Sequence, residues 1–116
     1  MKVTGLKWAG TRTEGFDDTV RFFENVMGLD LEETQSGFAS FRTQEGDKFE
    51  VFGPEDPDHG FMTCPVVGFG VEDIDSARAE LERAGVEFIG ATHRQGDNAW
   101  AHFRGPDGNV YEITSS

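Results

Sequence analysis

The chain has 116 residues, a hydrophobic fraction of 36% with 11 Phe and 2 Trp, and a formal net charge of −12. This length fits one domain or two small modules, and the aromatic content can build a core, which excludes global disorder. The excess carboxylates disfavour binding to nucleic acid or to anionic membranes. They favour the binding of cations, although a surface of this charge can also serve only to keep the protein in solution.

The single cysteine, Cys64, cannot form a disulfide within the chain. We therefore expect a cytoplasmic protein, with Cys64 as a buried or half-buried structural thiol. No apolar run at the N-terminus resembles a signal peptide, and none elsewhere approaches the length of a membrane span.

The first half of the chain is predicted to form a strand, a helix and three more strands. Residues 6–13 alternate weakly in polarity, which indicates a strand. Asp17 and Asp18 are typical of a helix start, and Gly28 is placed to end that helix. The apolar face of this helix comprises Val20, Phe23, Val26 and Met27. Further strands are expected at 29–33, 38–42 and 49–52, the last two joined by a turn at 44–47.

The second half repeats this order. Residues 66–71 form an apolar strand, and residues 73–76 open a helix that Gly85 ends. The buried stripe of this helix is predicted to be Ile74, Ala77, Leu81 and Ala84. The remaining strands are expected at 86–89, 99–103 and 109–114, with a Gly-Pro-Asp-Gly turn at 105–108 joining the last two.

The spacing of matching features indicates an internal duplication. Gly28 and Gly85, which end the two helices, are 57 residues apart, and Glu50 and Glu112 are 62 apart. The sequence thus predicts an α+β fold of two βαβββ modules, at about 1–53 and 66–116. Residues 54–65 hold three of the four prolines and read as the linker.

Alternation along the strands assigns the polar residues to faces. Glu50 lies opposite Phe49 and Val51, and Glu112 lies opposite Tyr111 and Ile113. Two carboxylates at equivalent positions of a repeat suit a divalent cation or a cationic ligand.

The three histidines show no close spacing of metal ligands. His102 shares a strand face with Trp100 and Arg104, which fits a ligand pocket and a plain surface strand equally well. His59 and His93 fall in predicted loops, where we expect solvated side chains.

The chain resembles the vicinal-oxygen-chelate superfamily, which includes glyoxalase I, extradiol dioxygenases and bleomycin-binding proteins. The resemblance rests on residues 19–29, 71–77 and above all 103–113, where Gly105 replaces a common Asp and Pro-Asp-Gly-Asn-Val-Tyr-Glu-Ile follows. It implies two βαβββ modules that form a curved mixed sheet around a cavity. It also implies a homodimer.

The resemblance further implies where a metal would bind. Metal-binding members place His or Gln on the first strand of each module and Glu on the last. Glu50 and Glu112 match the glutamate positions, whereas the first-strand positions fall on Trp8 and Val66, which cannot bind a metal. We therefore expect no cofactor, with a divalent metal on Glu50 and Glu112 as the remaining possibility.

The predicted pocket combines aromatic, acidic and basic side chains, which suits an aromatic or cationic organic ligand better than a bare metal. Its members are Trp8, Gly10, Arg12, Glu50, Phe52, Trp100, His102 and Glu112. We expect a metal-independent protein that binds a small molecule. The alternatives are a lyase or isomerase, with Glu112 or Glu50 as base and His102 assisting, and an interaction module with a vestigial pocket.

Overall fold

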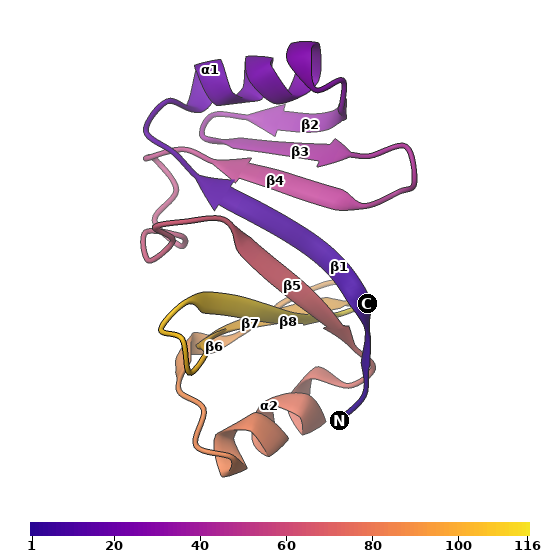
Figure 1. The fold of residues 1–116 in the computed structure, drawn as a ribbon, viewed down its shortest axis with the longest axis vertical. Helices are drawn as coiled ribbons and strands as arrows, with labels where there is room; N and C mark the ends of the chain where they lie inside the picture. Colours follow the sequence, from indigo (N-terminus) through magenta and orange to yellow (C-terminus); the bar gives the residue numbers. More distant parts are fainter. The chain divides into compact units, whose positions relative to one another are not determined.

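The computed structural model describes residues 1–116 and contains eight strands and two α-helices, the first of which continues into a π-helix (Figure 1). The first repeat comprises β1 (Val3–Arg12), α1 (Phe16–Arg21), the π-helix η1 (Phe22–Val26), β2 (Asp30–Gln35), β3 (Phe38–Arg42) and β4 (Lys48–Phe52). The second comprises β5 (Val66–Val71), α2 (Ile74–Arg83), β6 (Phe88–Gln95), β7 (Asn98–Arg104) and β8 (Val110–Ser115). The predicted α+β fold with two βαβββ repeats is confirmed.

The strands are hydrogen-bonded in the order β2-β3-β4-β1-β5-β8-β7-β6, with parallel and antiparallel pairs. The chain divides into two compact units. Unit 1 comprises Met1–Lys7 and Val67–Ser116, and unit 2 comprises Trp8–Val66. Strand β1 therefore gives its first residues to unit 1 and its last residues to unit 2. The expected module boundaries near 53 and 66 stay a prediction.

Unit 2 has an aromatic core between its strands and its helix. Ala39, Phe41 and Val51 are buried there. The ring of Phe23 lies 4.7 Å from that of Phe49 and 6.3 Å from that of Phe41, which joins η1 to β3 and β4. Strand β1 pairs in parallel with β4, so Gly10 lies beside Glu50 and Arg12 beside Phe52.

The helix of unit 2 differs from the expected one in its second half. The amide of Met27 donates to the carbonyl of Phe22, five residues earlier, at 3.0 Å. A π-turn contains one residue more than an α-turn and so changes which side chains face the core. Val26 and Met27, predicted to be buried, are 73% and 57% exposed. Gly28, with φ +77°, follows the last turn as predicted.

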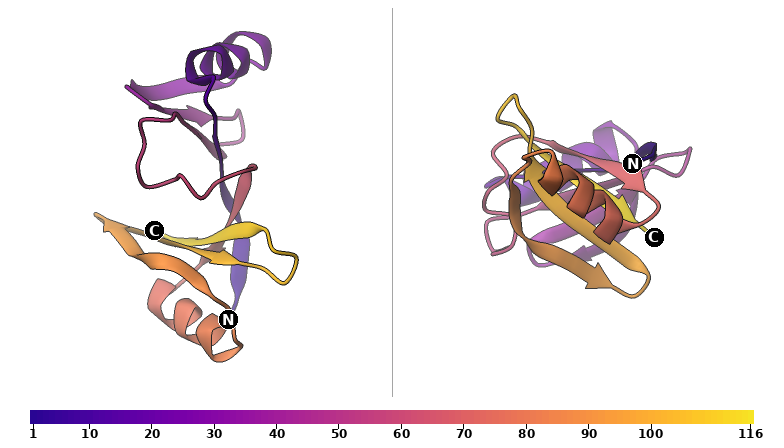
Figure 2. Two further views of the ribbon diagram at one scale, coloured as in Figure 1. Left: turned by 90° about the vertical axis from the view of Figure 1, so that its left-hand side faces the viewer. Right: turned by 90° about the horizontal axis from the view of Figure 1, so that it is seen from below.

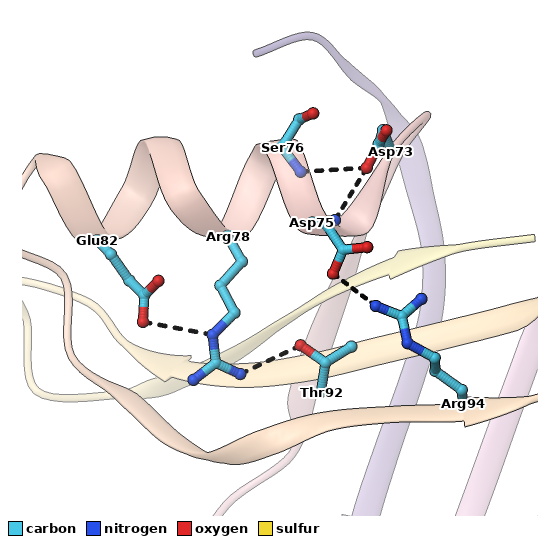
Figure 3. Close-up of polar contacts among 7 residues, drawn as sticks. All are labelled: Asp73, Asp75, Ser76, Arg78, Glu82, Thr92 and Arg94. Carbon is cyan, nitrogen blue, oxygen red and sulfur yellow. Dashed lines mark hydrogen bonds and ion pairs between the residues drawn. The ribbon is translucent and has the colours of Figure 1, made fainter.

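Unit 1 has an aliphatic core beneath α2, which lies across the strands of its sheet (Figure 2). The buried residues are Val71, Ile74, Ala77, Ala99, Ala101 and Ile113. Helix α2 starts at Asp73, whose Oδ1 accepts from the amides of Asp75 and Ser76 at 3.0 and 3.1 Å (Figure 3). This cap satisfies two of the amides that a helix start leaves without partners.

Two arginines link α2 to β6 (Figure 3). Arg94 donates to Asp75 at 2.5 Å, and Arg78 donates to Thr92 at 3.2 Å. The guanidinium of Arg78 also lies 4.4 Å from the centre of the Phe88 ring. The Arg78 guanidinium thus holds the helix against the sheet both by hydrogen bonds and by a cation–π contact.

Two predictions from the second half need correction. Strand β6 was expected at 86–89 but runs over Phe88–Gln95, because a bulge between Ile89 and His93, with Gly90 at φ +76°, breaks the alternation. His93 therefore lies in a strand and not in a loop. Cys64 is exposed, not buried, because it lies in the connection between β4 and β5. No helix in the structure has the length and apolar character needed to cross a membrane.

Candidate functional site

The central feature of unit 2 is a contact between an indole and a carboxylate. The Nε1–H of Trp8 donates to Oε1 of Glu50 at 2.8 Å, and Lys48 Nζ lies 3.5 Å from the other carboxylate oxygen. Both glutamate oxygens thus face hydrogen-bond donors of the protein itself. Charge-assisted bonds of this kind are stronger than neutral ones.

Gly10 makes this contact possible. A Cβ atom at Gly10 would lie 2.3 Å from two carbons of the Trp8 ring. The indole therefore passes directly over Gly10 on its way from β1 to Glu50 on β4. Any larger residue at position 10 would force the ring away from the carboxylate.

Arg12 lies next along the same face of β1. Its Nε is buried without a hydrogen-bond partner, and Nη1 lies 3.5 Å from the exposed carboxylate of Glu14. Its neighbour across the sheet is Phe52, which is buried.

His59 is packed in unit 2, whereas the sequence predicted a solvated side chain. Its ring stacks on Phe52 with centroids 3.8 Å apart and an interplanar angle of 14°. Its Nδ1 lies 2.9 Å from Oδ2 of Asp56. The stack fixes Phe52, whose ring also lies 6.4 Å from that of Trp8. The connection after β4 therefore supports the aromatic residues Phe52 and Trp8. This is a tertiary contact that the local sequence pattern does not predict.

Unit 1 holds the second glutamate in a different setting. Glu112 on β8 is the register partner of His102 on β7, and Oε1 lies 3.1 Å from the imidazole Nε2. Their side chains are 5% and 3% exposed. On the same strand Trp100 stacks on His93, with centroids 5.6 Å apart and an interplanar angle of 13°. Unit 1 thus presents a buried acid–imidazole pair and an aromatic pair.

The eight predicted pocket residues divide between the two units. Unit 2 brings together Trp8, Gly10, Arg12, Glu50 and Phe52, and unit 1 brings together Trp100, His102 and Glu112. The complete pocket of eight residues stays a prediction.

The donor set of the chain does not fit the metal site that the family resemblance implies. An indole N–H donates hydrogen bonds and offers no lone pair in its ring plane, and the side chain of Val66 is apolar. The Glu50 carboxylate is engaged by Trp8 and Lys48. No three His, Cys, Asp or Glu side chains are grouped so that they could hold a metal ion.

Sequence reasoning did not find a cavity of about 580 Å³ in unit 2, beside the start of α1. Its lining includes Glu14, Asp17, Asp18 and Glu55, while Arg21 is paired with Asp18. The sequence shows Asp17 and Asp18 only as a helix start, because the β2–β3 and β4–β5 connections that also line the cavity are distant along the chain.

Comparison with known proteins identifies the family. The model of the Glyoxalase/Bleomycin resistance protein/Dioxygenase superfamily matches residues 5–113. The chain belongs to this superfamily. The predicted resemblance is therefore confirmed over nearly the whole chain. No curated protein sequence matches this glyoxalase-superfamily chain.

Solved structures with the same fold include enzymes of different kinds. Methylmalonyl-CoA epimerase from Mycobacterium tuberculosis is 18% identical, with 97% of this chain and 88% of that chain covered and a TM-score of 0.74. The Mn(II)-bound glyoxalase from Novosphingobium aromaticivorans is 20% identical, with 98% and 39% covered and a TM-score of 0.75.

A variant of methylmalonyl-CoA epimerase from Streptomyces coelicolor was solved in complex with 2-nitronate-propionyl-CoA. It is 19% identical, with 99% of both chains covered and a TM-score of 0.70. At these identities the neighbours of this glyoxalase-superfamily chain establish its fold and leave its reaction open.

Proposed function

We propose that this glyoxalase-superfamily chain binds a small organic ligand without a resident metal. The observation that carries the proposal is the 2.8 Å hydrogen bond from Trp8 to Glu50, made across Gly10. A glutamate at the position where family members bind metal is here bonded to the protein's own indole.

The energetic argument concerns the Glu50 carboxylate. A metal at Glu50 would have to displace the indole, and hydrogen bonds to charged groups contribute about 1.5–3 kcal/mol. It would also have to compete with the ammonium of Lys48, 3.5 Å away. Neither of the first-strand residues, Trp8 and Val66, has a side chain that could coordinate the metal ion and so offset this loss.

The chemistry that remains suits an organic ligand. Unit 2 offers the Trp8 indole, supported by Phe52, next to the charged groups of Arg12 and Glu50. Sites for small organic molecules typically combine aromatic surface with a few placed polar groups. Unit 1 by itself presents the stacked rings of Trp100 and His93 on the strands that also carry the pair of His102 and Glu112 or lie beside them.

The test is a thermal melt of EDTA-treated protein with Ni²⁺, Mn²⁺, Zn²⁺, Fe²⁺ or Mg²⁺, and separately with a panel of aromatic compounds. A ligand at a hundred times its dissociation constant adds about 2.7 kcal/mol, which shifts the melt visibly. We expect metals to leave the wild type unchanged and at least one aromatic compound to stabilise it.

A matched control restores the missing ligands. The double variant Trp8→His, Val66→His places imidazoles at both first-strand positions and releases Glu50 from the indole. Stabilisation of this variant by a metal, with none for the wild type, would support the proposal directly. Metal stabilisation of the wild type that Glu50→Gln and Glu112→Gln both abolish would overturn it.

A second candidate function rests on the buried pair in unit 1. A carboxylate 3.1 Å from an imidazole and almost fully buried can take a proton from a bound carbon acid while the imidazole assists. This arrangement favours a lyase or isomerase with Glu112 as base. It predicts that wild-type protein exchanges deuterium from solvent into a bound ligand and that Glu112→Gln, while folded, does not.

A further inference from the structure

The most unusual polar group of unit 2 is the guanidinium of Arg12. Its Nε is buried and has no hydrogen-bond partner, and its only ion pair is a 3.5 Å approach of Nη1 to Glu14. The Glu14 side chain is 77% exposed, so this ion pair contributes little. A buried donor without a partner is costly, and native structures keep few of them.

The side of this guanidinium that carries the unpartnered Nε suits one kind of hydrogen-bond acceptor. Nε and the neighbouring terminal nitrogen present two parallel N–H groups, the spacing of which matches the two oxygens of a carboxylate. We propose that Arg12 anchors the carboxylate of an aromatic carboxylic acid. This inference rests on the proposed function and names the class of ligand for the unit 2 face.

The aromatic part of the assignment comes from Trp8. Its ring passes over Gly10, and Gly10 separates Trp8 from Arg12 on one face of β1. From Gly10, over which the indole lies, to Arg12 is two residues along the strand or about 6.6 Å, close to the length of a benzene ring that bears a carboxylate. A ligand ring on the indole therefore places its carboxylate at Arg12.

The buried ring of Phe52 supports the aromatic end of this arrangement. It is the register partner of Arg12, and its centroid lies 6.4 Å from that of Trp8. Its other contact, the stack on His59, holds it in place. Phe52 thus supports the Trp8 ring and lies beside Arg12 on the neighbouring strand.

The net charge of −12 opposes any anion at long range. At physiological ionic strength this repulsion is screened beyond about 8 Å, so the guanidinium dominates its own surroundings. Glu14 is the nearest competing carboxylate, and Glu14→Gln is therefore expected to tighten the binding of a carboxylic acid.

The test is isothermal titration calorimetry with 2-naphthoate, 2-naphthamide and 2-naphthylmethylamine, all in EDTA. These probes share one ring system and differ in charge. We expect 2-naphthoate to bind at least tenfold more tightly than the amide or the amine. The expected loss in Arg12→Gln is roughly tenfold to a hundredfold for 2-naphthoate, with little change for the amide.

Two further variants distinguish the effect of the planar N–H pair of Arg12 from the effect of its positive charge. Arg12→Lys keeps the charge and loses the planar fork, so it should recover only part of the affinity. Arg94→Gln, in unit 1, removes the same charge from an exposed arginine and should leave binding unchanged. Without ligand, Arg12→Gln should melt no lower than wild type, because it removes a donor that has no partner.

The outcomes distinguish this inference from the proposed function. Equal binding of all three probes, or an Arg12→Gln variant that keeps its affinity for 2-naphthoate, would overturn the role of Arg12 and leave organic-ligand binding standing. Binding of none of the three at millimolar concentration would also overturn it. The proposed function is decided separately, by the melts with metals and the wider aromatic panel.

Discussion

The two repeats carry a glutamate at equivalent strand positions but surround it differently. In unit 2 Glu50 is bound by an indole N–H and approached by a lysine, and its side chain is 15% exposed. In unit 1 Glu112 is 5% exposed and faces the imidazole of His102. A duplicated fold thus preserved the place of the carboxylate and changed its partner.

This difference shows that a position in a fold does not determine a chemical role. The partner decides whether a carboxylate acts as an acceptor in the structure, as a metal ligand or as a base. The helices differ in the same way, because α2 has a side-chain cap whereas α1 has none and continues into a π-turn.

Removal of the two glutamates should produce the largest contrast. Glu112→Ala leaves a buried imidazole without its carboxylate, and leaving a buried polar group without its partner costs about 1–3 kcal/mol, or more when the group is charged. Glu50→Ala removes one hydrogen bond and a partly exposed ion pair, so about 1–2 kcal/mol is expected. Urea denaturation measures both values. Equal losses would mean that the two settings are energetically alike.

Substitution of one strand glycine in each unit should give the next largest difference in stability. In Gly10→Ala the new methyl meets the indole ring of Trp8 at 2.3 Å, so we expect a loss of about 1–3 kcal/mol. In Gly70→Ala, in unit 1, the new methyl would lie 2.5 Å from the Thr4 hydroxyl and 2.6 Å from Lys7 Cγ, and both residues are exposed, so their side chains can turn away. The expected loss is then under about 1 kcal/mol. Thermal melts compare the two, and a smaller loss for Gly10→Ala would contradict the geometry.

The helix starts should respond to smaller changes of opposite sign. Asp73→Ala removes the side-chain cap of α2 and should cost about 1 kcal/mol. Gly15→Ser supplies α1 with a hydroxyl that it lacks and should gain a few tenths, roughly 0.3 kcal/mol. Chemical denaturation of both variants gives the two shifts. A gain from Asp73→Ala would show that the cap is not formed.

The smallest effect concerns a turn of unit 1 at acid pH. The Tyr111 hydroxyl, which donates to Asp107 at 2.5 Å, and the Asn109 amide hold the pKa of Asp107 below its ordinary value of 3.8. The stability that this carboxylate contributes is complete above pH 3.8 and is lost as the pH falls through the lowered pKa. Tyr111→Phe should raise the pKa of Asp107, measured by NMR titration. An unchanged pKa would exclude the hydroxyl as its cause.

The sequence predicted the face on which each site residue lies, because side chains along a strand alternate by geometry alone. The strand over residues 66–71 was predicted from its apolar pattern and is present with the same bounds. Alternation likewise predicted that Glu50 and Val51 point to opposite faces of their strand. The bond between Trp8 and Glu50 could not be predicted, because it depends on the side-chain torsions of Trp8 and on the space that Gly10 leaves. Only the spacing of a Trp and a Gly on one strand face gave a signal.

The remaining errors share a physical cause. The π-turn of η1 and the bulge after Ile89 each insert a residue into a regular period, and the pattern beyond them changes face. The stack of His59 on Phe52 joins a connection to a strand through tertiary packing. None of these features can be predicted from the local periodicity of the sequence.

The division of β1 between the units has a consequence for synthesis on the ribosome. Unit 2 is one continuous segment, Trp8–Val66, and we expect it to fold while the second repeat is still being translated. Met1–Lys7 is translated before unit 2 but belongs with Val67–Ser116, and Val3 and Leu6 are exposed even in the finished fold. This segment therefore waits for its partners until after unit 2 is made, and a nascent chain stalled before β5, its neighbour in the sheet, should leave it open to proteases.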